Sequence, residues 1–294
     1  MQLLRFAHGP ETLRLGDLEV RRLGYGTMRL PGKDVWGEPE DPVRAHAVLR
    51  RAVELGVNLI DTAWYYGPHV ANRLIVEALH PYPSDLVIAT KLGARRPPDK
   101  TWVPALKPEE LRAGVEEDLR SLRLEQLPVV HLRWIEQKDV TLAVALDAMR
   151  ELQREGKVRH LALSNVNVAQ LEQGLATGPI VAVQNLFNLR GSAGPIPAAA
   201  KPEALLAACE AHGIAFLPFF PLAIGALATG GGGLDLIAKR LRCTPAQLAI
   251  AWLLARSPVM LPIPGTSQVT HLEENLGAVH VALDAATLAE LAAG

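Results

Sequence analysis

The stretch KVRHLALSNVNVAQLEQGLATGPIVAVQN, residues 157–185, contains the unit from which the fold can be predicted. Its first part, 157–164, is an apolar segment of strand length, and 167–176 has the spacing of an amphipathic helix. A second apolar segment, 180–185, follows after a short connection. A strand, a helix and a strand joined in this way predict a right-handed crossover between parallel strands.

The same alternation continues in both directions from this unit. Further strands are expected at 20–26, 57–61, 85–91, 127–132, 214–219 and 259–264. Helices are expected at 42–56, 69–80, from Pro108 onward, 139–155, from Pro202 to Gly213, and at 234–257 with a break near Thr244-Pro245. Eight such units close into a barrel, whereas a doubly wound sheet usually has about six strands. We therefore predict an α/β fold of the (β/α)8 TIM-barrel type.

Short elements are expected at both ends of this series. A β-hairpin at 11–20 turns at Gly16-Asp17, and two extra helices at 268–277 and 284–293 follow the eighth strand. The 294 residues suit such a barrel, which typically needs about 250 residues. Because no linker divides the chain, we expect one domain over residues 1–294.

Composition and charge exclude several classes of protein. The net charge of −1 indicates no nucleic-acid partner. The start, MQLLRFAHGP, lacks the apolar core of a signal peptide, and no uncharged apolar run reaches about 18 residues, so no membrane partner is expected. Cys209 and Cys243 lie in separate expected helices, without metal-ligand spacing. We expect a cytoplasmic monomer or weak homo-oligomer with reduced thiols and no metal.

Polar residues end five successive predicted strands: Asp61, Lys91, His131, Ser164-Asn165 and Gln184-Asn185. Each has an ordinary structural explanation taken alone, as a turn or helix cap, a core histidine, or a lysine that reaches solvent. A barrel, however, places its chemistry at the carboxyl ends of its strands. Their shared placement at one rim predicts an active site.

The residue types at this rim point to proton transfer. A buried Lys91 held by Asp61 stays charged, because the pair compensates the cost of desolvation. That charge beside Tyr66 is expected to lower the pKa of the phenol from near its usual value of about 10. A neutral His131 can orient a carbonyl group by a hydrogen bond. Such a site protonates a developing alkoxide, and the matching step is hydride addition to a carbonyl.

At these residues the chain resembles the aldo-keto reductase superfamily over about 12–292. The resemblance rests on motifs that fall in order along the chain: LGYGTM (23–28), IDTAWYYG (60–67), TKLG (90–93), VVHLRW (129–134), LSNVN (163–167), VQNLFNL (183–189), FFPL (219–222) and IPGTSQVTHLEEN (263–275). It implies a catalytic tetrad of Asp61, Tyr66, Lys91 and His131. Tyr66 rather than Tyr65 matches the proton donor, because it precedes Gly67.

The resemblance also implies NADPH as cofactor, bound without a Rossmann fingerprint. Gly26, Thr27 and Met28 would line the pocket near the reacting carbon. Ser164, Asn165 and Gln184 would bind the nicotinamide carboxamide, and Phe219, followed by Pro221 and Leu222, would stack on its ring. Gly265, Thr266 and His271 match the positions that hold the 2′-phosphate, and Glu274 and Asn275 those near the adenine. Many members have Lys and Arg where this chain has Gly265 and His271, so we expect only a modest preference over NADH.

Within the superfamily the loops resemble the bacterial pyridoxal reductase branch. The likeness lies in YGPHVANRLIVEAL (66–79), KLGARR (91–96) and DKTWVPALKPEEL (99–111). It suggests pyridoxal to pyridoxine as a reaction, although members of that branch can lack the histidine that stands here at 131. The loop 92–107, with Arg95, Arg96 and Trp102, is either a rim of the substrate pocket or a solvated surface loop. Trp64 and Trp134 are either pocket walls or core residues.

Two other functions fit parts of this pattern. A nicotinamide-binding regulatory module with weak reductase activity would keep the same barrel and tetrad. A TIM-barrel hydrolase or aldolase would use Lys91 for a Schiff base, or His131 with Asp61 for a metal. His131 and Asp61 alone would give a metal ion only two protein ligands. A small-molecule carbonyl compound is the expected substrate.

Overall fold

The computed structural model describes residues 6–190, 202–229, 231 and 233–293. Seven parallel strands follow one another around a curled sheet, in the order β10-β9-β8-β7-β5-β4-β3. They are β3 (Tyr25–Gly26), β4 (Leu59–Asp61), β5 (Val87–Arg95), β7 (Leu127–Arg133), β8 (Val158–Ser164), β9 (Ala182–Leu186) and β10 (Ala215–Phe219). Each strand pairs with its neighbour in the chain, as successive right-handed crossovers require.

The eighth barrel position is filled by residues 259–264 as an extended segment. On one side Phe216 of β10 donates to Val259 O and accepts from Leu261 N, at 2.9 and 2.8 Å. On the other side Pro262 O accepts from Gly24 N at 3.0 Å. The sequence predicted a regular strand here, but only one bridge, between Phe216 and Met260, is regular. The physical reason is that prolines 262 and 264 have no N–H to donate toward β3.

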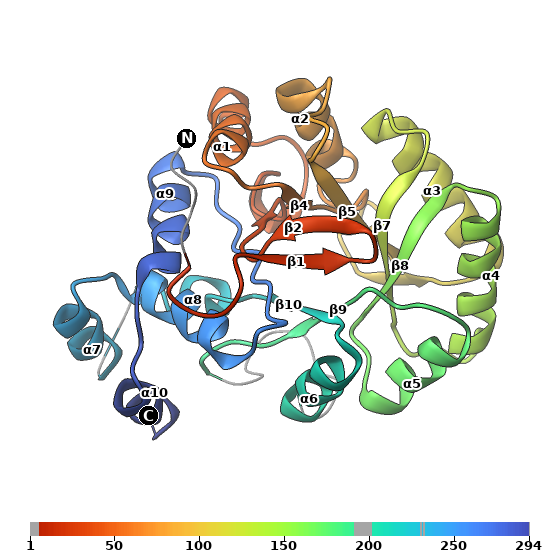
Figure 1. Ribbon diagram of the computed structural model, residues 1–294. Coiled ribbons are helices and arrows are strands. Elements are labelled where there is room, and N and C mark those ends of the chain that lie inside the picture. Colours follow the sequence, from red (N-terminus) through yellow and green to blue (C-terminus); the bar gives the residue numbers. More distant parts are fainter. Residues whose placement is uncertain (1–5, 191–201, 230, 232, 294) are drawn as a thin grey trace.

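Helices cover the outside of the barrel (Figure 1). They are α1 (Pro42–Glu54), α2 (Val70–Leu79), α3 (Pro108–Leu122), α4 (Leu142–Arg154), α5 (Val168–Ala176), α6 (Pro202–His212), α7 (Gly233–Leu241), α8 (Pro245–Arg256), α9 (Val269–Gly277) and α10 (Ala285–Ala293). The break predicted within 234–257 is confirmed. Thr244 caps α8 by accepting a hydrogen bond from Gln247 N, and Pro245 occupies the first turn.

The antiparallel hairpin of β1 (Thr12–Leu15) and β2 (Leu18–Arg21) lies across the barrel (Figure 1). Leu15 and Val20 are fully buried and pack with the apolar side chains of the barrel interior. The predicted hairpin at 11–20 is therefore confirmed, and it covers the end opposite the carboxyl ends of the strands.

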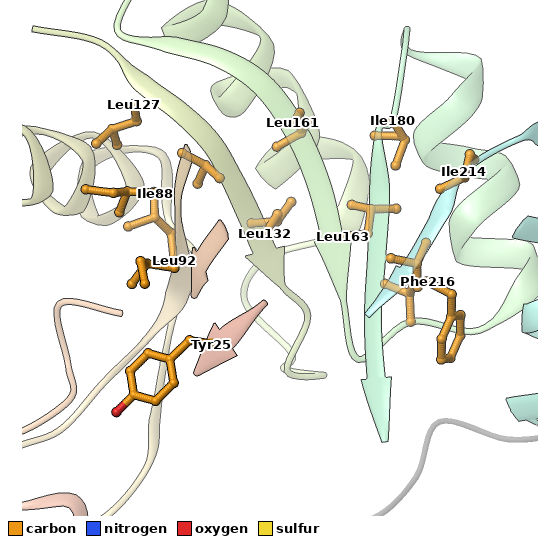
Figure 2. Packing of buried hydrophobic residues seen from close by; sticks show 14 of the residues in the cluster. Tyr25, Ile88, Leu92, Leu127, Leu132, Leu161, Leu163, Ile180, Ile214 and Phe216 are labelled. Atoms are coloured by element: carbon orange, nitrogen blue, oxygen red, sulfur yellow. The ribbon is translucent and has the colours of Figure 1, made fainter. Parts of the chain in front are cut away.

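Strand alternation sorts the side chains into two layers. Ile88 and Leu92 of β5, with Leu132 of β7, belong to the large cluster between strands and helices (Figure 2). Ala89 and Val129, at alternate positions, pack inside the barrel. Because successive side chains of a strand point to opposite faces, every second residue after Ala89 and Val129 also faces the interior. That periodicity carries polar residues into the barrel at the carboxyl ends.

The segment 92–107, predicted as a loop, contains a second hairpin. β5 continues to Arg95 and pairs antiparallel with β6 (Val103–Ala105). Arg96 donates to the carbonyl oxygens of Asp34 and Val35 at 2.8 and 2.7 Å, and its guanidinium lies over Trp102. The strand signal of 103–105 was obscured because Pro104 interrupts it.

Candidate active site

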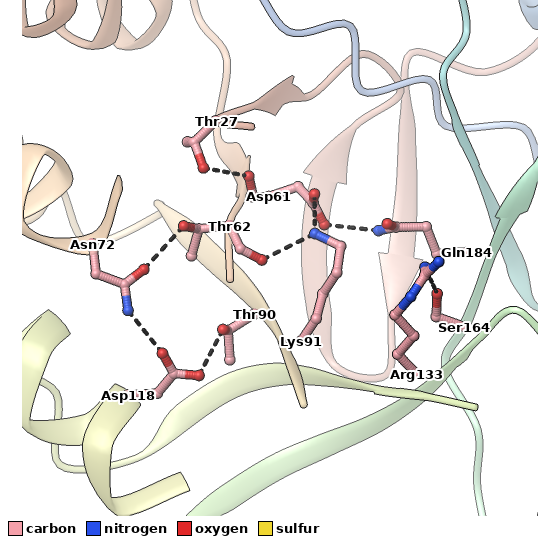
Figure 3. Close-up of polar contacts among 10 residues, drawn as sticks. All are labelled: Thr27, Asp61, Thr62, Asn72, Thr90, Lys91, Asp118, Arg133, Ser164 and Gln184. Atoms are coloured by element: carbon pink, nitrogen blue, oxygen red, sulfur yellow. Dashed lines mark hydrogen bonds and ion pairs between the residues drawn. The ribbon is translucent and has the colours of Figure 1, made fainter. Parts of the chain in front are cut away.

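Lys91, midway along β5, and Asp61, the last residue of β4, form a buried ion pair (Figure 3). Lys91 Nζ also donates to the Thr62 carbonyl oxygen at 3.0 Å. The other oxygen of Asp61 accepts from Gln184 Nε2 at 2.7 Å. Both side chains are nearly inaccessible to solvent. The ion pair and the additional hydrogen bonds therefore replace the water that would otherwise solvate the two charges. The sequence correctly predicted this pairing.

His131 stands beside Lys91, because the two residues are register partners on β7 and β5. The imidazole is fully buried, and neither ring nitrogen has a hydrogen-bond partner of good geometry in the described part of the chain. Burial lowers the pKa of His131 to about 4. The ring is therefore neutral near pH 7. A buried polar group without a partner needs an explanation, and a bound molecule is one.

Tyr66 lies in the turn that follows β4, with Lys91 Nζ 5.0 Å from the centroid of its ring. Burial raises the pKa of Tyr66, the carboxylate of Asp61 raises it further, and the guanidinium of Arg133 lowers it. The direction is opposite to the one expected from sequence. The reason is that Lys91 is already neutralised by Asp61, so burial decides the outcome. The phenol is thus held in its protonated form.

A second polar network lies behind this pair and was missed by the sequence analysis (Figure 3). Asn72 of α2 accepts from Thr62 Oγ1 at 2.9 Å and donates to Asp118 Oδ1 of α3 at 2.7 Å. Asp118 Oδ2 accepts from Thr90 Oγ1, also at 2.7 Å. Burial raises the pKa of Asp118 to about 7. The network ties the backbones next to Asp61 and Lys91 to two helices.

A cavity of about 400 Å³ opens beside Tyr66 and Asp61. Most of the residues predicted to bind a cofactor line it: Gly26, Met28, Gln184, Phe219, Pro221, Leu222, Gly265, Thr266, His271, Glu274 and Asn275. They come from β3 and the segment after it, from β9, from the end of β10 and the loop after it, from the connection that follows residues 259–264, and from α9. Residues more than two hundred positions apart in the chain therefore share one cavity.

Three predicted cofactor residues, Thr27, Ser164 and Asn165, are not part of the cavity wall. Thr27 is buried, and its hydroxyl donates to Asp61 O at 3.1 Å. Ser164 Oγ accepts from Arg133 at 3.3 Å. Asn165 has a positive φ of 60° and donates from Nδ2 to Trp134 O at 2.9 Å. Each lies at the predicted strand end, but its polar group is engaged with the protein.

One positively charged residue of the cavity wall was not identified by the sequence analysis. Arg29 lines it and lies beside Gly265, and Arg29 is the only lysine or arginine among the described lining residues. Nothing in the sequence marked Arg29, because it follows the LGYGTM motif in an irregular segment. Its position next to the predicted phosphate site becomes visible only when β3 and the segment 259–264 are brought together.

Two other expectations can be compared with the described residues. No group of three or more potential metal ligands occurs among them. None of their helices combines the length and apolar character needed to span a bilayer. An aldolase would use Lys91 to form a Schiff base. Here the ammonium group of Lys91 is paired with Asp61 and donates a hydrogen bond to the Thr62 carbonyl oxygen.

The chain is similar to known proteins in sequence and in structure. Residues 22–293 match the Aldo/keto reductase family. Pyridoxine 4-dehydrogenase of Escherichia coli strain K12 is 44% identical over 285 residues, covering 95% of this chain and 96% of that protein. An uncharacterized oxidoreductase of Schizosaccharomyces pombe is 42% identical over 280 residues, covering 95% and 88%. An aldo-keto reductase of Klebsiella pneumoniae, solved in complex with NADPH, has a TM-score of 0.78 at 25% identity, covering 96% and 93%.

The fold and the site thus define an oxidoreductase, and the chain belongs to the aldo/keto reductase family. This confirms the resemblance predicted from the motifs, including its likeness to the pyridoxal reductase branch. The (β/α)8 barrel predicted from strand–helix alternation is confirmed by the architecture and by the structural neighbours.

Proposed function

We propose that the protein is an NADPH-dependent reductase that converts an aldehyde or ketone to an alcohol, with Tyr66 as the proton donor. One observation carries the proposal: Lys91, paired with Asp61, holds its ammonium group 5.0 Å from the ring of Tyr66, at the wall of the cavity. An acid, a fixed cation and a neutral imidazole meet there. This is the set that protonation of a developing alkoxide requires.

Each residue of the tetrad has a distinct role in this proposal. Tyr66 gives its phenolic proton to the carbonyl oxygen, and its raised pKa keeps that proton in place near neutral pH. Lys91, whose position Asp61 fixes, lies over the Tyr66 ring and offsets only part of the cost of the buried phenolate that remains. His131 is neutral and donates a hydrogen bond that orients the carbonyl group.

NADPH fits the residues that line the cavity, and when bound it supplies the hydride. Phe219 offers an aromatic face for the nicotinamide, and Gln184 an amide for its carboxamide. Arg29, Thr266 and His271 provide a cation and hydrogen-bonding groups for the 2′-phosphate. This set compensates for the missing Lys and Arg at 265 and 271. Gly26 and Met28 would line the reacting end, Pro221 and Leu222 the ring contact, Gly265 the phosphate site, and Glu274 and Asn275 the adenine end. We propose that Thr27 supports the reacting end and that Ser164 and Asn165 support the carboxamide site from the adjoining strand ends, because their polar groups are engaged with the protein.

Reduction of pyridoxal to pyridoxine is the specific reaction we assign to this site. It is supported by the relative named Pyridoxine 4-dehydrogenase, which is 44% identical over nearly the whole of both chains.

Oxidation of NADPH, followed by absorbance with pyridoxal and with 4-nitrobenzaldehyde, tests the proposal. Tyr66→Phe is expected to lower kcat at least 100-fold, as loss of a general acid does, with little change in the Kd of NADPH. Tyr65→Phe is the matched control, because the Tyr65 hydroxyl has no hydrogen-bond partner in the described part of the chain. Full activity of Tyr66→Phe would show that another group is the acid. Tight NADPH binding without turnover of any carbonyl would favour the regulatory module.

A single domain over residues 1–294 and a cytoplasmic monomer or weak homo-oligomer belong to the same proposal. The free thiols of Cys209 and Cys243 support a reducing compartment. Light scattering of the purified protein tests the oligomeric state, and cell fractionation tests the location.

A further inference from the structure

Arg133 is a cation next to the active site that the mechanism above does not use. It lies at the end of β7, two residues after His131, and therefore on the same face of the strand. Its register partner on β8 is Ser164, whose hydroxyl accepts a hydrogen bond from the guanidinium at 3.3 Å (Figure 3). The side chain is half-buried, so it is neither a solvated surface arginine nor part of the core.

The guanidinium lies against Phe219, one of the residues that line the cavity. Its central carbon lies 5.3 Å from the ring centroid of Phe219, a lining residue. Its charge lowers the pKa of both Tyr65 and Tyr66, against the effect of burial. Arg133 therefore acts electrostatically on the phenol to which a carbonyl oxygen must come.

Within the described part of the chain, Arg133 has no acidic partner. No ion pair among the described residues includes it, although many of their other arginines are paired. The nearby carboxylate of Asp61 is already bound by Lys91 and Gln184. An arginine presents several N–H donors in a planar fork, and here one hydroxyl takes up one of them. The remaining donors are suited to an anionic oxygen.

We infer that Arg133 binds an anionic group of the carbonyl substrate and so makes the enzyme selective for negatively charged aldehydes. The inference rests on the proposed reductase function and narrows its substrate class. A carboxylate or phosphate satisfies the fork with two parallel hydrogen bonds. An ionised ring hydroxyl beside an aldehyde, as in pyridoxal, satisfies it with one or two. A neutral aldehyde leaves the guanidinium without an anionic partner.

The test compares aldehydes of the same shape and different charge. The 3- and 4-carboxybenzaldehydes are anions, and the corresponding nitrobenzaldehydes are neutral and nearly isosteric. For each pair the ratio of kcat/KM values is measured with NADPH for the wild type and Arg133→Gln. Effects on cofactor binding or proton transfer are common to both aldehydes and cancel in this ratio.

We expect Arg133→Gln to lower the anion-to-neutral ratio at least tenfold in one or both pairs, mainly through KM of the carboxylate. Arg133→Lys keeps the charge without the planar fork, so its anion-to-neutral ratio is expected to lie between those of the wild type and Arg133→Gln. Arg154→Gln is the matched control, since Arg154 is exposed at the end of α4, near the opposite end of the barrel, and its loss changes the net charge equally. It is expected to change the ratio less than twofold.

The inference is overturned if the anion-to-neutral ratio of Arg133→Gln stays within twofold of the wild-type ratio in both pairs. That result is distinct from failure of the proposed function, in which the wild type oxidises NADPH with no aldehyde. In that event, calorimetric titration of the NADP⁺-loaded protein with 4-(hydroxymethyl)benzoate and with 4-nitrobenzyl alcohol decides the question. Preferential binding of the anion that Arg133→Gln abolishes supports the inference, and equal binding refutes it.

Discussion

Replacement of Asp118 by asparagine tests whether the network behind the active site contains a neutral carboxylic acid. Asp118 is fully buried on α3 and accepts hydrogen bonds from Thr90 and Asn72. Burial raises its pKa from 3.8 to about 7, an effect larger than the opposing effect of the two hydrogen bonds. Asparagine has the shape of the protonated acid and no charge. It can donate toward Thr90 Oγ1 and accept from Asn72, so the network persists.

The magnitude follows from the two pKa values of Asp118. Its pKa is higher in the folded than in the unfolded state, so the stabilisation is complete below about pH 4 and is lost as the pH rises to about 7. The free energy of unfolding falls by about 1.4 kcal/mol per pH unit in this window and levels off above it. Between pH 5 and pH 8 the free energy of unfolding of the wild type therefore falls by about 3 kcal/mol, and that of Asp118→Asn does not show this fall.

Urea unfolding at pH 5, 6, 7 and 8, followed by circular dichroism, measures this difference. Asp118→Asn should gain about 3 kcal/mol relative to the wild type from the lowest to the highest pH. Asp147→Asn, a change at an exposed position of α4, should run parallel to the wild type. Parallel curves for the wild type and Asp118→Asn would refute the reasoning, because the carboxyl group would then be ionised in both states.

Three further predictions concern the barrel and its histidine. The buried guanidinium of Arg22 donates to five backbone carbonyl oxygens, those of His8, Pro10, Leu254, Ser257 and Met260. Arg22→Lys leaves at least two of them unsatisfied and should reduce the free energy of unfolding by about 3 kcal/mol, against little change for Arg154→Lys. Gly265→Ala should destabilise the protein by about 1–3 kcal/mol and weaken NADPH binding in a fluorescence titration, because a Cβ there would lie 2.5 Å from Gly26 O. His131, with its pKa lowered to about 4, should show no change in its NMR ring signals between pH 5.5 and pH 8, and a titration near pH 6.5 would contradict its burial in neutral form.

The sequence by itself determined the barrel and the residues at its rim. Strand–helix alternation is a local property, and each crossover has only one favoured hand, so the order of the strands follows from the chain. Asp61, Lys91 and His131 could be located because each ends an apolar segment, where a barrel exposes its interior face. Their pairing then followed from charge.

Tertiary structure alone decided the properties that depend on distance and burial. The pKa of Tyr66 is raised, because the charge that was expected to lower it is neutralised within the same site. Asp118 and Arg29 carry no local signal, one in mid-helix and the other in an irregular segment, and their roles arise from neighbours far away in the chain. Arg133 looked like an ordinary arginine after a strand. Whether a charge is paired, screened or left free is a property of three-dimensional neighbours, and one-dimensional spacing does not contain it.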